Sequence, residues 1–199
     1  NYVKNDSHTR MIKQLEKMSL QRAEAVTANT PFNQSDLGSL FNRTVEFSII
    51  PYQKPTMVGA INGSDSPLVV GWLQKIKGVL TTVEAIKQCT FQNKNIKLRW
   101  VGGDSYTAPG ASKMSSFLQS SYSEVWNQNF FWLDEKPNDE VQELIKNASL
   151  IIIPSEWETF NYVALEAASL HKPIIVTGTT GASYLFTHRH YAWVMPAND

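Results

Sequence analysis

The sequence lacks the features that mark a disulfide framework, a nucleic-acid binder or a membrane-spanning protein. Cys89 is its only cysteine, so no intrachain disulfide and no cysteine-built metal site can form. Its 18 lysines and arginines balance 18 aspartates and glutamates, whereas nucleic-acid binders normally carry a basic excess. No apolar run approaches the roughly 20 residues that span a bilayer. We expect a cytoplasmic protein, at most attached peripherally to the inner face of a membrane, with no nucleic-acid partner and no transmembrane segment.

The composition does provide for a folded core. Of the 199 residues, 42% are hydrophobic and 18% are charged, which excludes a polyelectrolyte and a disordered chain. At roughly 100–200 residues per domain, this length corresponds to one domain, or one domain and a piece of another. The sequence opens on Asn1 without a methionine or an apolar signal segment, so we expect a piece of a longer protein.

The first 50 residues predict a β/α fragment, and the next 16 predict a linker. Apolar spacing indicates helices at 8–22 and 34–41, the second capped near Asn33 or Ser35, and strands at 23–29 and 45–50. Residues 51–66 are rich in proline, glycine and serine, a composition that interrupts regular structure.

From residue 67 onward, short apolar strands alternate regularly with helices. Strands are expected at 68–73, 96–101, 130–133, 150–153 and 173–176, and helices at 76–89, 112–122, 138–147, 160–170 and 182–187. This alternation is typical of an α/β domain, with a Rossmann-like parallel sheet covered by helices on both faces.

In such sheets, ligands bind beyond the carboxyl ends of the strands, so the strand-to-helix turns are the candidate sites. Lys77 and Gly78, near the start of a helix, are able to place an ammonium and backbone amides on a phosphate. The alternative is a solvated lysine beside a turn glycine. Gly102 and Gly103 allow a close backbone approach to a ligand or simply form a tight turn.

A third turn contains two glutamates eight residues apart, Glu158 and Glu166. On one continuous helix they would lie on adjacent sides, on the order of 12 Å apart along the axis. A carboxylate among apolar helix neighbours needs hydrogen-bond donors, which polyol hydroxyls supply. The alternative is that Glu158 caps the helix and Glu166 pairs with a lysine.

Together these motifs resemble the C-terminal half of family-4 glycosyltransferases, the "glycosyl transferases group 1" family with the GT-B fold. The resemblance covers residues 68–199, and residues 1–50 resemble the end of the family's N-terminal, acceptor-side domain. It is carried by Glu-x7-Glu at Glu158 and Glu166, by Val70-Gly71 with Lys77-Gly78, by Trp100-Val101-Gly102-Gly103, by Pro154-Ser155, by Lys172-Pro173-Ile174-Ile175-Val176 and by Thr180-Gly181.

The resemblance implies a nucleotide-sugar-binding domain at residues 67–199 that transfers a sugar with retention of configuration. Lys77 would contact the diphosphate, Glu158 the donor sugar and Glu166 the ribose hydroxyls. The remaining donor-site positions would be Gly71, Trp72, Leu133 near the base, Thr159, and the backbone amides of Phe160, Asn161 and Tyr162. The family needs no metal cofactor, and the acceptor would be a glycan, a lipid-linked sugar or a small molecule.

The sequence departs from the family pattern at three of these positions. Thr159 and Asn161 stand where the family has glycines, and Trp72 stands where it has an arginine that stabilises the departing diphosphate. Trp72 therefore favours an alternative from another class, a catalytically silent glycosyltransferase-like binding subunit. A nucleotide-sugar epimerase of the same fold has no supporting residue.

Overall fold

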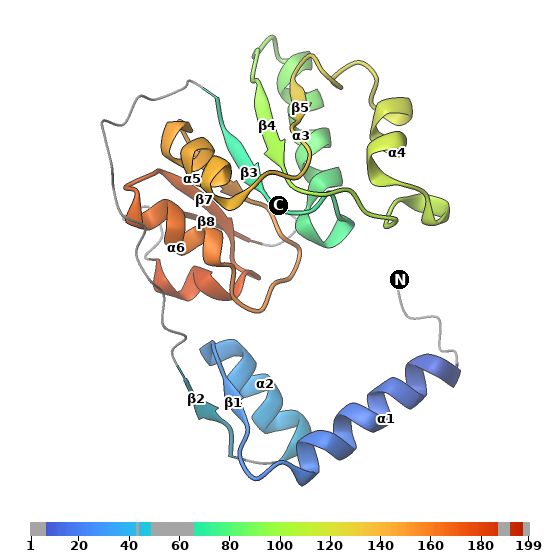
Figure 1. Ribbon diagram of the computed structural model, residues 1–199, viewed down its shortest axis with the longest axis vertical. Helices are drawn as coiled ribbons and strands as arrows, with labels where there is room; N and C mark the ends of the chain where they lie inside the picture. The colour runs from blue at the N-terminus through green and yellow to red at the C-terminus, as the bar shows by residue number, and fades with distance from the viewer. Residues whose placement is uncertain (1–6, 43, 49–65, 187–191, 197–199) are drawn as a thin grey trace. The chain divides into compact units, whose positions relative to one another are not determined.

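A computed structural model describes residues 7–42, 44–48, 66–186 and 192–196 (Figure 1). The chain divides into two compact units, Asn1–Pro51 and Tyr52–Asp199, which we treat separately. Of the expected linker at residues 51–66, only Ser66 lies within the described residues.

The first unit contains two helices and two short strands: α1 (Ser7–Arg22), β1 (Thr27–Ala28), α2 (Pro31–Phe41) and β2 (Glu46–Phe47). The strands pair in parallel with α2 as the connection. The cap expected near Asn33 or Ser35 is wrong, because Thr30 caps α2 and its Oγ1 accepts the N–H of Asn33 at 3.1 Å. Pro31 explains the earlier start, since its fixed φ and missing N–H suit the first helical position.

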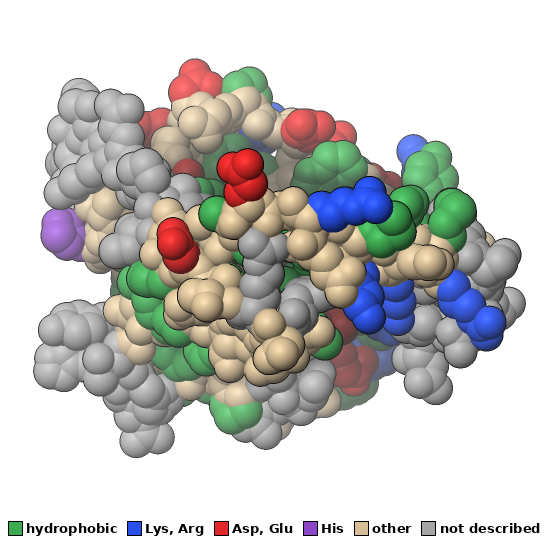
Figure 2. Space-filling view, turned by 90° about the horizontal axis from the view of Figure 1, so that it is seen from below, with side chains coloured by type: hydrophobic (Ala, Val, Ile, Leu, Met, Phe, Trp, Pro, Cys, Tyr) green, Lys and Arg blue, Asp and Glu red, His purple; other side chains and the backbone are tan. Residues whose placement is uncertain are grey.

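Helix α1 leaves an apolar stripe exposed. Met11, Ile12 and Leu15 are each about half accessible to solvent, and Met18 is 38% exposed. Figure 2, a view of the molecule from below, shows several lysine and arginine side chains with hydrophobic side chains next to them. The amphipathic helix predicted for residues 8–22 is confirmed, because α1 spans Ser7–Arg22.

The second unit is built on a six-stranded parallel sheet in the order β5-β4-β3-β6-β7-β8. The strands are β3 (Leu68–Val70), β4 (Leu98–Val101), β5 (Phe130–Trp132), β6 (Ile151–Ile153), β7 (Ile174–Thr177) and β8 (Trp193–Met195). The predicted parallel α/β sheet is confirmed. Strand β8 was not anticipated, since three residues next to a proline give too short a pattern.

Helices cover both faces of this sheet and create two cores (Figure 1). Successive strand residues point to opposite faces, so Trp100 packs with α3 (Val79–Phe91) and α4 (Met114–Ser121), whereas Val101 packs with α5 (Asn138–Asn147) and α6 (Tyr162–Ser169). None of the helices in the described residues is long and apolar enough to cross a membrane.

The helix expected at 76–89 is interrupted near its start. Residues Lys75–Lys77 form a 3-10 turn, η1, and Gly78 then adopts a left-handed conformation with φ +76° before α3 begins. Two further 3-10 turns are η2 (Pro109–Ala111) and η3 (Gly181–Leu185), the latter where a short helix was expected.

The strand order places a topological switch point between β3 and β6. From β3 the chain moves outward to β4, and from β6 it moves outward in the other direction to β7. The connecting helices α3 and α6 lie on opposite faces, so a crevice opens at the carboxyl ends of β3 and β6.

Candidate functional site

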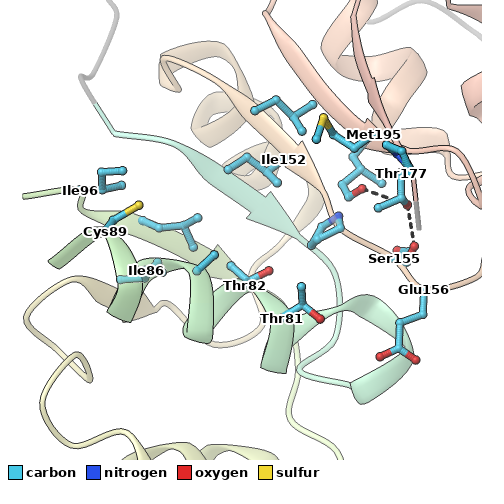
Figure 3. A pocket seen from close by; sticks show the side chains of 16 residues that line it. Thr81, Thr82, Ile86, Cys89, Ile96, Ile152, Ser155, Glu156, Thr177 and Met195 are labelled. Atoms are coloured by element: carbon cyan, nitrogen blue, oxygen red, sulfur yellow. Dashed lines mark hydrogen bonds between the residues drawn. The ribbon is translucent and has the colours of Figure 1, made fainter. Parts of the chain in front are cut away.

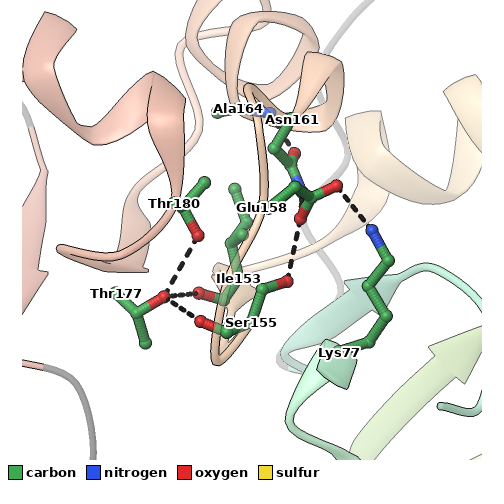
Figure 4. Close-up of polar contacts among 8 residues, drawn as sticks. All are labelled: Lys77, Ile153, Ser155, Glu158, Asn161, Ala164, Thr177 and Thr180. Atoms are coloured by element: carbon green, nitrogen blue, oxygen red, sulfur yellow. Dashed lines mark hydrogen bonds and ion pairs between the residues drawn. The ribbon is translucent and has the colours of Figure 1, made fainter. Parts of the chain in front are cut away.

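An ion pair joins the loops that follow β3 and β6. The Nζ of Lys77, in η1, lies 2.5 Å from Oε1 of Glu158 (Figure 4). The lysine side chain is 27% exposed and the glutamate side chain 16%. These two residues were predicted separately from sequence, and the structure brings them together at the switch point.

Gly78 allows the two loops to approach so closely. A Cβ at this position would lie 2.0 Å from the carbonyl oxygen of Pro154, well inside any real contact. Next to it, the N–H of Glu156 donates to the carbonyl of Ile76 at 2.8 Å. The lysine-bearing turn is therefore fixed directly to the end of β6.

Glu158 has two further donors on its other oxygen. Ser155 Oγ lies 2.9 Å and Asn161 Nδ2 lies 2.8 Å from Oε2 (Figure 4). Ser155 is itself held through its carbonyl, which accepts from Thr177 Oγ1 at 2.6 Å. Three donors thus surround one largely buried carboxylate, which satisfies the hydrogen-bonding needs of a buried charge.

Asn161, rather than Glu158, caps α6. Its Oδ1 accepts the N–H of Ala164 at 3.1 Å, and its own backbone has φ +81°, which is unusual for a residue with a side chain. The alternative in which Glu158 caps the helix is therefore wrong. Because α6 begins only at Tyr162, the helical spacing assumed for the two glutamates does not apply either.

The other two residues of the helix start, Phe160 and Tyr162, pack against each other. Their rings lie 5.4 Å apart between centroids, with Phe160 buried and Tyr162 exposed. The carbonyl of Phe160 accepts the N–H of Ala182, which ties the loop to η3. Thr159, next in the chain to Glu158, is exposed.

Glu166 lies on α6, away from the hydrogen bonds around Glu158. Burial raises the pKa of Glu166, and a hydrogen bond with Gln142 of α5 opposes that rise. Among the residues that the structure describes, the hydrogen-bond partner of this carboxylate is Gln142 and not the lysine of the alternative. A ligand with hydroxyl groups would stabilise the charged form of this carboxylate by donating hydrogen bonds to it.

Gly71, Trp72 and Leu133 lie along the same edge of the sheet. The Gly71 carbonyl accepts from the indole of Trp100 at 2.7 Å, while Leu133 packs against the core formed with α5 and α6. Trp72 is 51% exposed, and its ring lies against Gly103, where a Cβ would be 3.7 Å from the indole. Trp72 is thus a surface residue beside the end of β4 rather than part of the core.

Sequence reasoning missed Arg99, which lines a hollow of about 770 Å³ together with Leu133 and Gln142. Among the described residues, its Nε and Nη2 are buried without a hydrogen-bond partner, as is Oε1 of Gln142. Desolvation lowers the pKa of Arg99. An arginine inside an otherwise apolar strand was the available signal.

A separate pocket of about 270 Å³ lies between α3 and strands β6 to β8 (Figure 3). Its walls are mainly apolar, with Ile86, Ile152 and Met195 among them, and Ser155 and Glu156 lie at one end. No lysine or arginine belongs to its described lining, so the pocket offers no cation to a diphosphate.

The described residues contain no group of three or more His, Cys, Asp or Glu side chains able to hold a metal ion. Two of the four histidines of the sequence, His188 and His190, lie outside those residues.

Residues 61–199 match the family described as glycosyl transferases group 1. The chain belongs to that family. An uncharacterized glycosyltransferase of Methanocaldococcus jannaschii, MJ1607, is 27% identical over 143 residues, which make up 71% of this chain and 34% of that protein. The chain therefore spans much less than the full length of this relative.

Solved structures of glycosyltransferases resemble nearly the whole chain. WaaG, a glycosyltransferase involved in lipopolysaccharide biosynthesis, gives a TM-score of 0.75 at 19% identity over 97% of this chain and 55% of its own. Anabaena HepE, in a crystal structure with UDP and glucose, gives 0.70 at 17% identity over 96% of this chain and 54% of its own. At these identities the likeness establishes the fold, that of part of a GT-B glycosyltransferase.

Proposed function

We propose that this group 1 glycosyltransferase chain binds a nucleotide diphosphate sugar at the carboxyl edge of its large sheet and supports transfer of the sugar with retention of configuration. The Lys77–Glu158 pair carries the proposal, because it joins a cation and a carboxylate at the switch point between β3 and β6. The crystal structure of HepE with UDP and glucose supports a donor of this class.

Lys77 is the proposed ligand of the diphosphate. Its ammonium is paired with Glu158, so a diphosphate has to compete with that carboxylate for it. A diphosphate carries more negative charge than one carboxylate, and the start of α6 adds the positive end of a helix dipole. Glu158 Oε1 then becomes available to a hydroxyl of the donor sugar.

The reaction we propose transfers a hexosyl group. The bond between the anomeric carbon and the diphosphate breaks, a bond to the acceptor oxygen forms on the same face, and the acceptor proton passes to the departing phosphate oxygen. Charge develops on the leaving diphosphate, so Lys77 and the helix start stabilise the transition state more than the bound donor. The acceptor is a glycan, a lipid-linked sugar or a small molecule, and no metal is required.

Glu166 is the proposed ligand of the ribose hydroxyls. Calorimetric titration of the full-length protein with UDP and GDP tests this role. Glu166→Ala should weaken nucleotide binding by about 1–3 kcal/mol, the cost of losing hydrogen bonds to a buried charged group. Glu84→Ala, on an exposed position of α3, is the control. Equal affinity in wild type and Glu166→Ala would show that Glu166 is not part of the site. A wild type that binds neither UDP nor GDP would contradict the proposed nucleotide diphosphate sugar donor.

A second candidate function is a silent binding subunit that holds a nucleotide sugar without transferring it. It rests on Trp72, whose half-exposed indole stands where the resembled family pattern has an arginine. An indole supplies no positive charge to the leaving group, so such a chain would keep binding and lose the chemical step.

A further inference from the structure

We infer that Asn161 is a positioning residue that orients the Glu158 carboxylate toward the donor sugar. The inference rests on the proposed function and adds a role for the side chain of a residue that stands where the resembled family pattern has glycine. It starts from the two ends of one amide group. Nδ2 donates to Glu158 at 2.8 Å, and Oδ1 accepts from the N–H of Ala164 at 3.1 Å.

This amide links the carboxylate rigidly to α6. The Ala164 N–H belongs to the first turn of the helix, and Ala164 itself is fully buried. The amide plane is therefore held from behind by a rigid element, and its donor end is aimed at Oε2 of Glu158 (Figure 4). With Oε2 fixed in this way, Oε1 is left facing Lys77 and the crevice.

The backbone of Asn161 indicates that this arrangement has a cost. At φ +81° and ψ 97° the residue lies in a region that glycine adopts freely and that residues with side chains rarely adopt. A glycine would remove that strain, and glycine at a helix N-cap costs only a few tenths of a kcal/mol relative to asparagine. Because glycine is itself an acceptable N-cap, stability alone gives little reason for a side chain here, whereas the hydrogen bond to Glu158 does.

Two substitutions separate orientation of Glu158 from capping of α6. Asn161→Asp retains the acceptor for the Ala164 N–H, since aspartate is an equally good N-cap, but it has no donor for Glu158 and sets a second carboxylate beside it, which repels the Glu158 carboxylate. Asn161→Gly suits the backbone and also lacks that donor. Asn161→Gly should fold with a melting temperature close to wild type, whereas the like charges in Asn161→Asp should lower it. Asn127→Asp makes the same chemical change at an exposed asparagine with φ +57° and is the control.

The test compares binding of the nucleotide diphosphate with turnover of the intact donor, both on the full-length protein. Glu158 is proposed to contact the sugar and not the nucleotide, so the Kd for UDP or GDP should stay within twofold in both variants. The kcat/KM for the donor sugar should fall at least about tenfold, as expected on losing a hydrogen bond to a charged group. Ser155 still donates to Oε2, which limits the loss.

The outcomes distinguish the inference from the proposed function. Wild-type turnover in Asn161→Asp or Asn161→Gly overturns the role of Asn161 and leaves the donor site standing. Weakened nucleotide binding together with a lowered melting temperature in Asn161→Gly assigns Asn161 to the helix alone and also overturns the inference. A wild type that neither binds a nucleotide nor turns over a donor overturns both proposals.

Discussion

A Cβ on Gly78 would stand 2.0 Å from the carbonyl oxygen of Pro154, so the turn before α3 and the end of β6 meet backbone to backbone. No side chain can be placed between them without moving one of the two loops. Since Lys77 precedes Gly78 and Glu158 lies four residues beyond Pro154, the two members of the ion pair lie on the loops that this contact joins.

Gly78→Ala should therefore destabilise the protein strongly. The left-handed φ of +76° costs about 1–2 kcal/mol for a residue with a Cβ, and forcing the loops apart adds roughly 1–3 kcal/mol. Gly110→Ala is the matched control, because Gly110 has φ +73° and nothing within 4 Å of its Cβ position. Urea unfolding should show a clearly larger loss for Gly78→Ala. Equal losses would show that the close approach does not constrain the loops.

The parallel sheet was predictable because its signal is local and repeated. Runs such as residues 150–153, apolar and flanked by helical patterns, identify buried strands without any knowledge of their neighbours. The strand expected at 23–29 is only Thr27–Ala28 in the structure. Its length is set by pairing with the two residues of β2 and not by its composition.

The candidate site was predictable only as separate pieces. Lys77 and Glu158 lie 81 residues apart in sequence, and no spacing rule relates them. Their contact follows from the strand order, which places β3 beside β6, and strand order is a property of the whole sheet. The side-chain role of Asn161 could not be predicted either. Its Nδ2 donates to Glu158, a loop residue outside the helix that Asn161 caps, and no sequence pattern indicates such a contact.

Lys77→Ala should abolish sugar transfer and leave the fold intact. The lysine side chain is 27% exposed, and Glu158 keeps Ser155 and Asn161 as donors, so the chain should still fold with a moderate loss of stability. The loss of a cation at the leaving group should be severe for transfer. Lys87→Ala is the control, because Lys87 on α3 also forms an ion pair, with Glu124 in the segment after α4. Transfer assays and thermal unfolding provide the two readouts. Robust transfer by Lys77→Ala would defeat the assignment of the phosphate site.

Glu166 should make stability depend on pH in a direction that its burial determines. Because burial raises its pKa, the folded chain binds the proton more tightly than the unfolded chain. The resulting stability is fully present below the unfolded pKa and is lost as pH rises through the folded pKa. Wild type should lose stability relative to Glu166→Gln between pH 4 and pH 7.

Urea unfolding of both proteins at the two pH values measures this difference. Glu84→Gln, at an exposed position of α3, controls for the loss of one negative charge. A gap between wild type and Glu166→Gln that stays constant with pH would contradict the raised pKa.

Trp72 separates an active transferase from a silent binder. Its indole is 51% exposed, so an arginine can replace it without opening a core cavity, and the new guanidinium would lie just after β3, five residues before Lys77 in the sequence. If the natural chain has lost chemistry at this position, Trp72→Arg should raise turnover from undetectable to measurable and tighten binding of the nucleotide diphosphate.

If the natural chain is active, Lys77 already supplies the charge that the reaction needs, and Trp72→Arg should change turnover by less than Lys77→Ala does. Donor hydrolysis and transfer assays on wild type, Lys77→Ala and Trp72→Arg decide between these cases. Trp193→Arg is the matched control, since Trp193 on β8 is 47% exposed and lies outside the loops that build the site. An equal gain from both arginine variants would mean that added positive charge acts through the general field of the protein. A gain confined to Trp72→Arg, on a wild type that binds but does not transfer, would show that the missing cation is what silences this site.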